Sequence, residues 1–226
     1  MMIQLNGSDL HSLYNTRFSV VERIRKQQLW KIFCEDFLQR YVPASSTVLD
    51  IGAGTCEFIN YIHAKKKYAL DLNPATSKHA NSDVTVFKLS ADKMDKVLRG
   101  TVNVAFMSNF LEHLDNKDVV YQILKKTYRV LSPGGKLLIM QPDIKRAGNQ
   151  YWDFFDHKTP ITAKSLSEAL LSVGFSIKQL IDPFMPYSTN ISWIPTSVFL
   201  LKIYLRFRPL QLLFGKQFFV LAEKPS

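Results

Sequence analysis

The sequence predicts an α/β fold in which helices cover both faces of a mostly parallel sheet. Between residues 47 and 141, short apolar runs bounded by turn residues alternate with stretches of helical period. Such alternation is typical of strand–helix–strand units, which build parallel sheets. Two further strand-like runs near the chain end, 175–180 and 218–223, predict an antiparallel edge strand. The length of 226 residues suits one full domain with appendages.

The first expected element is an amphipathic helix over residues 16–41. Apolar side chains recur there at steps of three and four residues, and Pro43 ends the pattern. We expect residues 1–43 to form an N-terminal helical lid and residues 44–226 to form the main domain. Within the main domain, an apolar and basic helical insertion is expected at about 190–215.

Strands and helices are then expected in alternation. The expected strands cover residues 47–51, 67–72, 84–89, 102–108, 136–141, 175–180 and 218–223. The expected helices cover residues 56–65, 75–80, 119–131 and 163–173. Ligands bind to such sheets beyond the carboxyl ends of the parallel strands. The predicted site therefore lies just after residues 51, 71, 89, 108 and 140.

Composition narrows the classes of partner. The formal net charge of +10 fits nucleic acid, anionic lipid or a phosphate-bearing small substrate. Cys34 and Cys56 lie in no metal-ligand spacing, which predicts reduced thiols in a cytoplasmic protein and no metal site. Neither a signal peptide nor a membrane-spanning run is expected from the sequence.

The loop after the first expected strand has the sequence Asp50-Ile51-Gly52-Ala53-Gly54-Thr55-Cys56-Glu57. Its two glycines allow a tight turn and close approach of the backbone to a ligand. A dinucleotide-binding loop has a third glycine where this chain has Glu57, and a pyrophosphate there would meet a carboxylate. The loop therefore argues against a nicotinamide dinucleotide. It favours a nucleoside without phosphates, whose cationic amino-acid tail tolerates nearby acids.

An acidic residue, Asp71, ends the second expected strand, nineteen positions after Gly52 (71 − 52). In nucleoside-binding sheets a carboxylate at this place accepts hydrogen bonds from the ribose hydroxyls. The alternative is an Asp that caps a helix in an ordinary turn. The glycine pair, Asp71 and the strand–helix order together favour the nucleoside.

In these features the chain resembles the class I S-adenosylmethionine-dependent methyltransferases, which have a Rossmann-like sheet of seven strands. The resemblance covers residues 40–142 and implies S-adenosyl-L-methionine as the cofactor and methyl transfer as the activity. The segments that carry it are Val48–Thr55, Asp71–Asn73, Ser108–Leu114 and Arg129–Gly135.

The resemblance also implies which residues bind the cofactor. Gly52, Ala53 and Gly54 would line its methionine part, and Asp50 would organise their loop. Asp71 and Leu72 would contact the ribose and the adenine.

Two further segments are assigned in the same way. Asn109 and Phe110 would border the sulfonium. Family members often have an acidic residue followed by alanine after the third strand, which holds the adenine amino group. Here the sequence is Ser90-Ala91-Asp92, and we expect the Ala91 backbone to act with the side chain of either Ser90 or Asp92.

Methyl transfer to a hydroxyl benefits from a general base, and histidine is the usual one. His113 follows the fourth expected strand, and His157 lies in a loop after the fifth, so both are candidate catalytic residues. For each, the alternative is substrate binding or a structural hydrogen bond.

The remaining candidates would contact the substrate. Aromatic side chains around His157 are suited to stacking on a sugar or another planar ring, with packing of a lid as the alternative. Tyr14 and Arg17 belong to the N-terminal segment, which looks like a lid over the cofactor. The substrate-binding candidates are Tyr14, Arg17, Tyr151, Trp152, Phe155 and His157.

The segment 193–214 is strongly apolar and basic. It fits four roles: a contact with an anionic membrane surface, a grip on a lipid-linked substrate, a cover for the active site, or a homodimer face. The region from Trp152 to the chain end also looks like bacterial methyltransferases of surface-polysaccharide or glycan biosynthesis. Peripheral attachment at the inner membrane surface is the corresponding alternative to a purely cytoplasmic location.

These observations lead to one expected function and two alternatives. We expect methyl transfer to a small molecule, a hydroxyl of a sugar nucleotide or lipid-linked glycan precursor. The alternatives are an RNA methyltransferase and a non-catalytic protein that binds S-adenosylmethionine. Nucleic acid is the less favoured partner, because no Asn-Pro-Pro-Tyr or Asp-Pro-Pro-Tyr motif follows the fourth strand and no RNA-binding module is recognisable.

Overall fold

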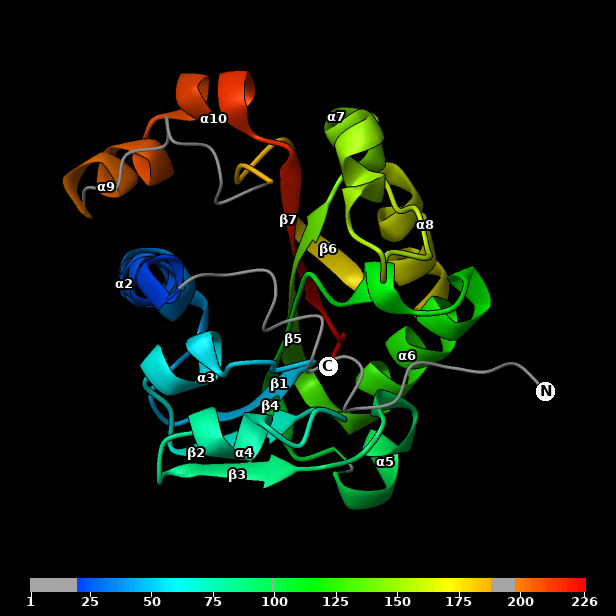
Figure 1. Cartoon of the computed structure of the whole chain (residues 1–226). Coiled ribbons are helices and arrows are strands. Elements are labelled where there is room, and N and C mark those ends of the chain that lie inside the picture. The colour runs from blue at the N-terminus through cyan, green and yellow to red at the C-terminus, as the bar shows by residue number, and fades with distance from the viewer. Residues whose placement is uncertain (1–19, 99, 188–197) are drawn as a thin grey trace.

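A computed structural model describes residues 20–98, 100–187 and 198–226 of the chain (Figure 1). Within these residues, the strands form one seven-stranded sheet in the order β3-β2-β1-β4-β5-β7-β6. Their bounds are β1 Thr47–Ile51, β2 Lys66–Leu70, β3 Val84–Phe87, β4 Val102–Ser108, β5 Leu131–Pro142, β6 Ser176–Ile181 and β7 Gln217–Glu223. The predicted α/β fold with a seven-stranded, mostly parallel sheet is confirmed.

The strand order reverses next to β1. Strand β1 pairs in parallel with both β2 and β4, so the chain runs outward through β2 and β3 and then returns to the other side. In open α/β sheets, ligands bind beyond the carboxyl ends of the strands at such a reversal. We therefore expect the ligand site to lie at the loops after β1 and β4.

The antiparallel strand is β7, which lies between β5 and the edge strand β6. The antiparallel strand expected at the sheet edge is thus present, one position inside β6. Residues 217–222 of β7 are all buried, whereas β6 exposes Lys178 and Leu180. An apolar run without alternation suits a strand covered on both faces, which explains why the last strand of the chain is not the outermost one.

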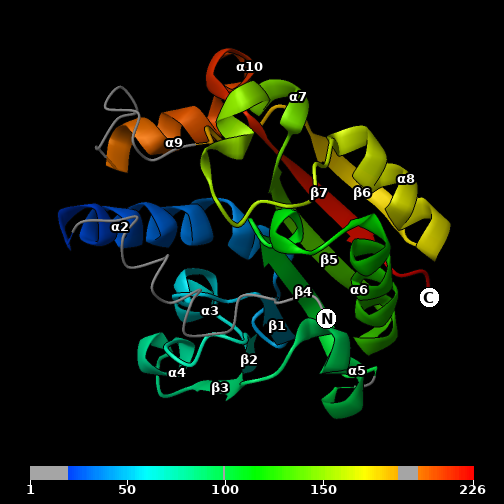
Figure 2. The same cartoon turned by 45° about the vertical axis from the view of Figure 1, so that its right-hand side comes forward.

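Helices cover both faces of the sheet (Figures 1 and 2). Their bounds are α2 Val20–Asp36, α3 Glu57–Tyr61, α4 Thr76–His79, α5 Met94–Val97, α6 Lys117–Val130, α7 Ile144–Ala147, α8 Ala163–Val173, α9 Val198–Arg206 and α10 Arg208–Phe214. The 3₁₀ helices are η1 Leu38–Tyr41, η2 Ala91–Lys93, η3 Leu111–His113 and η4 Gly148–Asp153. Helices α5, α6 and α8 pack on one face, and α2, α3 and α9 pack on the other. Strand β1 serves both layers, because Leu49 and Ile51 face the first core and Val48 faces the second.

Two expected elements of the main domain differ most from their predicted bounds. Helix α3 ends at Tyr61 instead of residue 65, because the amides of Lys65 and Lys66 donate to the Ser46 carbonyl and start β2 there. Strand β5 begins at Leu131, which already pairs with Val102, and a register shift accommodates the residues up to Lys136. In both cases pairing within the sheet overrides the local sequence pattern.

The expected N-terminal helix is divided in the described residues. Helix α2 ends at Asp36, and η1 follows after Phe37. Phe33, Phe37 and Leu38 are buried in the core beneath α9 and against the sheet. The carboxyl half of this segment is therefore packed into the main domain.

Candidate functional site

The loop after β1 adopts the backbone conformation that its glycines favour. Gly52 and Gly54 have φ angles of +73° and +52°, in the left-handed region. The amides of Gly52 and Ala53 donate to the Leu70 carbonyl at 2.9 and 3.3 Å, which ties the loop to the end of β2. A Cβ atom on Gly52 would lie 2.4 Å from the Phe110 ring, whereas one on Gly54 would meet nothing within 4 Å. The loop is closed by Phe110 at Gly52 and open at Gly54.

Asp71, directly after β2, links this loop to the turn that follows β2. Oδ2 accepts a hydrogen bond from the Gly54 amide at 2.7 Å, and Oδ1 accepts one from the Asn73 amide at 2.7 Å. Each oxygen has further acceptor capacity for a ligand. Burial raises the pKa of Asp71, while these backbone hydrogen bonds and the charge of His113 oppose the rise. The influence of His113 means that the ends of β2 and β4 are close enough to interact electrostatically.

Two more acids lie around the loop. Burial, followed by the negative charges of Glu57 and Asp71, raises the pKa of Asp50 well above its ordinary value. Burial acts in the same direction on Glu57, but the ammonium of Lys26 and the hydroxyl of Thr55 outweigh it and lower the pKa of Glu57. Lys26 Nζ lies 2.8 Å from Glu57 Oε1, so helix α2 is attached to the loop by an ion pair.

The other residues assigned to the cofactor lie on neighbouring loops at the same edge of the sheet. Leu72 is exposed next to Asp71. After β3, Ala91 is buried, Ser90 is partly buried and Asp92 is exposed. After β4, Asn109 has a φ of +47°, and its amide donates to the Met140 carbonyl at 3.0 Å. The structure thus gathers the expected positions, and their roles stay predictions.

His113 lies in η3, directly after β4, and is paired with Asp156. Its Nδ1 atom is 3.2 Å from the Asp156 carbonyl oxygen and 3.3 Å from the Asp156 Oδ2. Both oxygens only accept hydrogen bonds when the carboxylate is ionised, so Nδ1 must carry the proton and donate. In the neutral ring, the Nε2 atom then has the free lone pair. The side chain of His113 is 21% exposed, whereas that of Asp156 is 4% exposed.

His157 is brought to the same place by its loop. The amides of Lys158 and Thr159 donate to the Glu112 carbonyl at 2.8 and 3.0 Å, which docks the loop onto η3. The rings of His113 and His157 are 4.9 Å apart in an edge-to-face arrangement. The His157 side chain is only 4% exposed, and its Nε2 atom lies 4.0 Å from Glu112 Oε1. The two candidate histidines therefore meet, with His113 outside and His157 behind it.

The aromatic side chains around His157 have different positions. Tyr151 is fully buried and donates a hydrogen bond to the Thr159 carbonyl, so it shapes the loop from inside and does not lie on the surface where we expected a substrate contact. Trp152 and Phe155 are 52% and 81% exposed and remain available to a substrate. Tyr187 places its hydroxyl 3.2 Å from His157 Nδ1.

Glu112, His113 and His157 together have the composition of a metal site. One ligand atom from each lies within 4.8 Å of the others. Glu112 also accepts a hydrogen bond from Gln141 at 2.7 Å, and its pKa is raised by burial, against the charge of His113. The sequence predicted no metal, on the grounds that the two cysteines lie in no metal-ligand spacing, and the absence of a metal stays a prediction.

Several residues of the site were missed at the sequence level. Glu112 is adjacent to His113 in the chain, and that adjacency was the available signal. Asp156 likewise directly precedes His157, but its pairing with His113 is not visible in the sequence. Tyr187 carries no such signal, because the fold brings it to His157 from a separate loop. The expected contacts Tyr14 and Arg17 lie outside the described residues.

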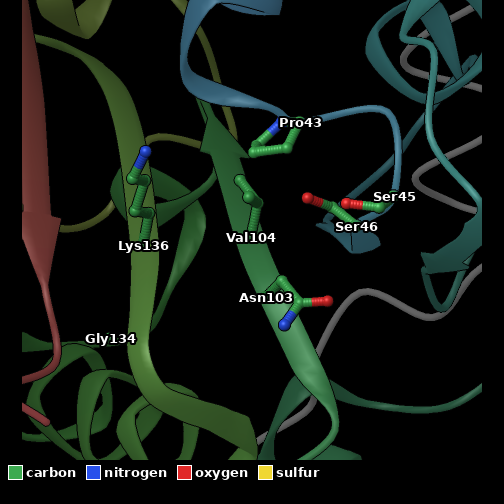
Figure 3. A pocket seen from close by; sticks show the side chains of 7 residues that line it. All are labelled: Pro43, Ser45, Ser46, Asn103, Val104, Gly134 and Lys136. Atoms are coloured by element: carbon green, nitrogen blue, oxygen red, sulfur yellow. The ribbon is translucent and has the colours of Figure 1, made fainter.

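The described residues also form a shallow depression at the opposite edge of the sheet (Figure 3). It lies at the amino ends of β1, β4 and β5, and its lining residues are Pro43, Ser45, Ser46, Asn103, Val104, Gly134 and Lys136. Lys136 is its one ionisable side chain. Its lining contains neither a histidine nor a carboxylate, so it lacks the groups that the site at the carboxyl edge offers.

Comparisons with known proteins agree with this geometry. A family model described as a methyltransferase domain matches residues 24–180. Among solved structures, an S-adenosylmethionine-dependent methyltransferase from Archaeoglobus fulgidus is 22% identical, with a TM-score of 0.66 over 88% of this chain and 94% of that one. One from Thermotoga maritima is 17% identical, with a TM-score of 0.64 over 94% and 95% of the two chains. One from Mesorhizobium loti is 16% identical, with a TM-score of 0.60 over 83% and 95%. No curated protein matches the sequence.

At these identities, the solved structures support the fold, while the family match covers more than half of the chain. The family match therefore identifies the activity and the cofactor that the resemblance implied. The chain belongs to the class I S-adenosylmethionine-dependent methyltransferases.

Proposed function

We propose that this methyltransferase acts on a hydroxyl group of a small molecule, a sugar or glycan precursor. The observation that carries the proposal is the pair of His113 and Asp156. Asp156 fixes the proton of His113 on Nδ1, which leaves Nε2 as a proton acceptor on a partly exposed ring. A hydroxyl acceptor needs such a base, because it must lose its proton as the new bond to carbon forms.

The residues around the β1 loop fit S-adenosylmethionine. When bound, this cofactor supplies an activated methyl carbon, so positioning provides much of the catalysis. Asp71 would accept hydrogen bonds from the ribose hydroxyls, and the open backbone at Gly54 would lie along the amino-acid tail. The three acids Asp50, Glu57 and Asp71 suit a cationic ligand better than a phosphate.

The acceptor side is assigned to the loops after β4 and β5. His113 would hold the acceptor hydroxyl and take its proton on Nε2. His157 is proposed as a positioning residue, because its buried ring packs against His113 and contacts Glu112 and Tyr187. Exposed Trp152 and Phe155 would stack on the sugar ring.

The test is methyl transfer from radiolabelled S-adenosylmethionine to a panel of nucleotide sugars and lipid-linked glycans. RNA is included as an acceptor, because the net charge of +10 favours it as the alternative. We expect label on a sugar hydroxyl in a product identified by mass spectrometry. Label on RNA alone, or on an amine, would contradict the proposal, and binding of the cofactor without turnover on any acceptor would favour the non-catalytic alternative.

A further inference from the structure

Helices α9 and α10 are held on the domain by one buried face. Leu201, Tyr204 and Leu205 are 4%, 5% and 8% exposed, and two of them join the core that contains α2. The Tyr204 hydroxyl donates to the Phe184 carbonyl at 2.6 Å, and Lys202 Nζ lies 3.5 Å from Asp36 Oδ2. These contacts fix the orientation of the helices, so their opposite face is presented outward.

That outward face is apolar, whereas a surface helix normally turns polar residues to water. Fourteen large hydrophobic side chains are exposed among the described residues, and half of them lie between positions 199 and 214. These seven, which we call the apolar face, are Phe199, Leu200, Ile203, Phe207, Leu212, Leu213 and Phe214. A concentration of this kind marks a surface that is covered by a partner or a membrane.

The charged residues of the two helices and the turn after them are all basic. From residue 198 to residue 216 the sequence has no Asp or Glu, but it has Lys202, Arg206, Arg208 and Lys216. Lys202 pairs with Asp36 on α2, whereas Arg208 donates to the carbonyls of Asp182 and Pro183, and Lys216 Nζ lies 2.5 Å from Gln150 Oε1, both neutral partners. Arg206 is exposed on the last turn of α9.

The apolar face lies at the end of the molecule that carries the site. Helix α10 leads into β7, whose first residue, Gln217, is opposite Pro142 at the carboxyl end of β5. The Asp143 amide, just before α7, donates to the Lys216 carbonyl at 2.9 Å. Both views show α7 and α10 near the start of β7, with α9 beside α10 and above α2 (Figures 1 and 2).

We propose that helices α9 and α10 bind the surface of a bilayer that contains anionic phospholipids. Exposed aromatic and aliphatic side chains would enter the boundary between headgroups and acyl chains, and the cations would face the lipid phosphates. The helices would lie on the surface, since no helix of the described ranges is long and apolar enough to cross a membrane. The excess of basic residues on α9 and α10 favours this occupant over a second copy of the chain, because two such faces would repel each other.

Co-sedimentation of the full chain with phosphatidylcholine vesicles, with and without phosphatidylglycerol, tests the proposal. We expect binding that requires phosphatidylglycerol and weakens with salt. Arg206→Gln should lower the partition coefficient by about fivefold, the effect of one cation near an anionic surface. Leu212→Glu combined with Leu213→Glu should abolish binding, and both side chains are exposed, so folding in water should be retained.

The matched control is Leu171→Glu, which alters an equally exposed leucine on α8, away from the apolar face. It should bind vesicles as the unmodified chain does. Equal binding by the double variant, or binding independent of phosphatidylglycerol, would overturn the proposal. A second result would also overturn it: the unmodified chain does not bind vesicles, but forms a dimer in analytical ultracentrifugation without lipid, and the double variant is a monomer.

Discussion

The two sides of the candidate site differ in the kind of group that forms them and in how far apart those groups lie in the sequence. The cofactor side consists of two consecutive strand ends, where backbone amides of Gly54 and Asn73 bind the Asp71 carboxylate within a stretch of about twenty residues. The acceptor side consists of side chains from separate loops, with His113, Asp156 and Tyr187 brought together by the fold. From this difference we infer that the first side is a platform for one cofactor, and we propose that the second determines which group is methylated.

Replacement of the base should have the largest effect and should separate the two sides. His113→Ala is expected to lower kcat by about 10²- to 10⁴-fold, the usual contribution of a general base. The affinity for S-adenosylmethionine, measured by calorimetry, should stay unchanged, because the ribose and loop contacts are made by other residues. His63→Ala is the control, since the hydrogen bonds at that exposed position use its backbone. If His113→Ala also lost affinity for the cofactor, His113 would contribute to cofactor binding, and the division into two sides would be wrong.

A change in the loop should act on the opposite side. In Gly52→Ala the new Cβ would collide with the Phe110 ring and impose a left-handed conformation on alanine. We expect S-adenosylmethionine to bind about a hundredfold more weakly, since the strain alone costs about 1–2 kcal/mol and Phe110 must also move.

Gly100→Ala is the matched control for this substitution. Gly100 has a φ of +59° and open space around its Cβ position, so it shares the backbone strain without the collision. Its cofactor affinity should match that of the unmodified chain. Equal affinities in all three proteins would rule out the loop as the cofactor platform.

The ribose contact should show a dependence on pH. Because burial raises the pKa of Asp71, its carboxylate becomes protonated at a higher pH than an ordinary Asp as the solution is acidified. Calorimetry should therefore show cofactor affinity falling as the pH drops through this raised pKa. Asp71→Asn should bind about ten- to a hundredfold more weakly at neutral pH and lose that dependence. If Asp71→Asn bound the cofactor with unchanged affinity, Asp71 would not be the residue that contacts the ribose.

The smallest effect is expected at Asp50, where stability and binding should change in opposite directions. Burial raises the pKa of Asp50 in the folded chain above its value in the unfolded chain. The free energy of unfolding therefore falls as the pH rises from the unfolded-state pKa to the folded-state pKa. At neutral pH, Asp50→Asn should raise the Tm of the free protein by about 2 °C. The additional stabilisation by S-adenosylmethionine should shrink. A lower Tm without cofactor would show that the charge supports the loop itself.

The strands and loops assigned to the cofactor side could be predicted from the sequence because their signals are local. The bounds of β1, β4 and α8 agree with the predicted ones, since apolar strands between turn residues and a helix ending at Gly174 are defined within a few positions. The prediction was wrong for α3, which ends four residues early, because pairing of β2 with β1 determines where the helix stops. Phe58, Ile59 and Ile62 are buried apolar residues, and their spacing does not show where the helix ends.

The acceptor side could be predicted only in part. Each histidine was placed near the strand ends, but their mutual contact depends on the Lys158 and Thr159 amides binding the Glu112 carbonyl. Such a contact joins residues 112 and 158, which no local pattern connects. For the same reason the burial of Tyr151 and of His157, and the pairing of His113 with Asp156, required the structure.

A crystal structure with the product S-adenosylhomocysteine bound tests the division of the site most directly. We expect ribose hydroxyls on Asp71, the amino-acid tail along Gly52–Gly54, and His113 nearer to the sulfur than His157. We also expect the Nδ1 contact of His113 with Asp156 to be retained, so that Nε2 faces the acceptor. Product bound in the depression at the amino ends of β1 and β4, or a sulfur nearer to His157 with the Asp156 contact broken, would contradict this division.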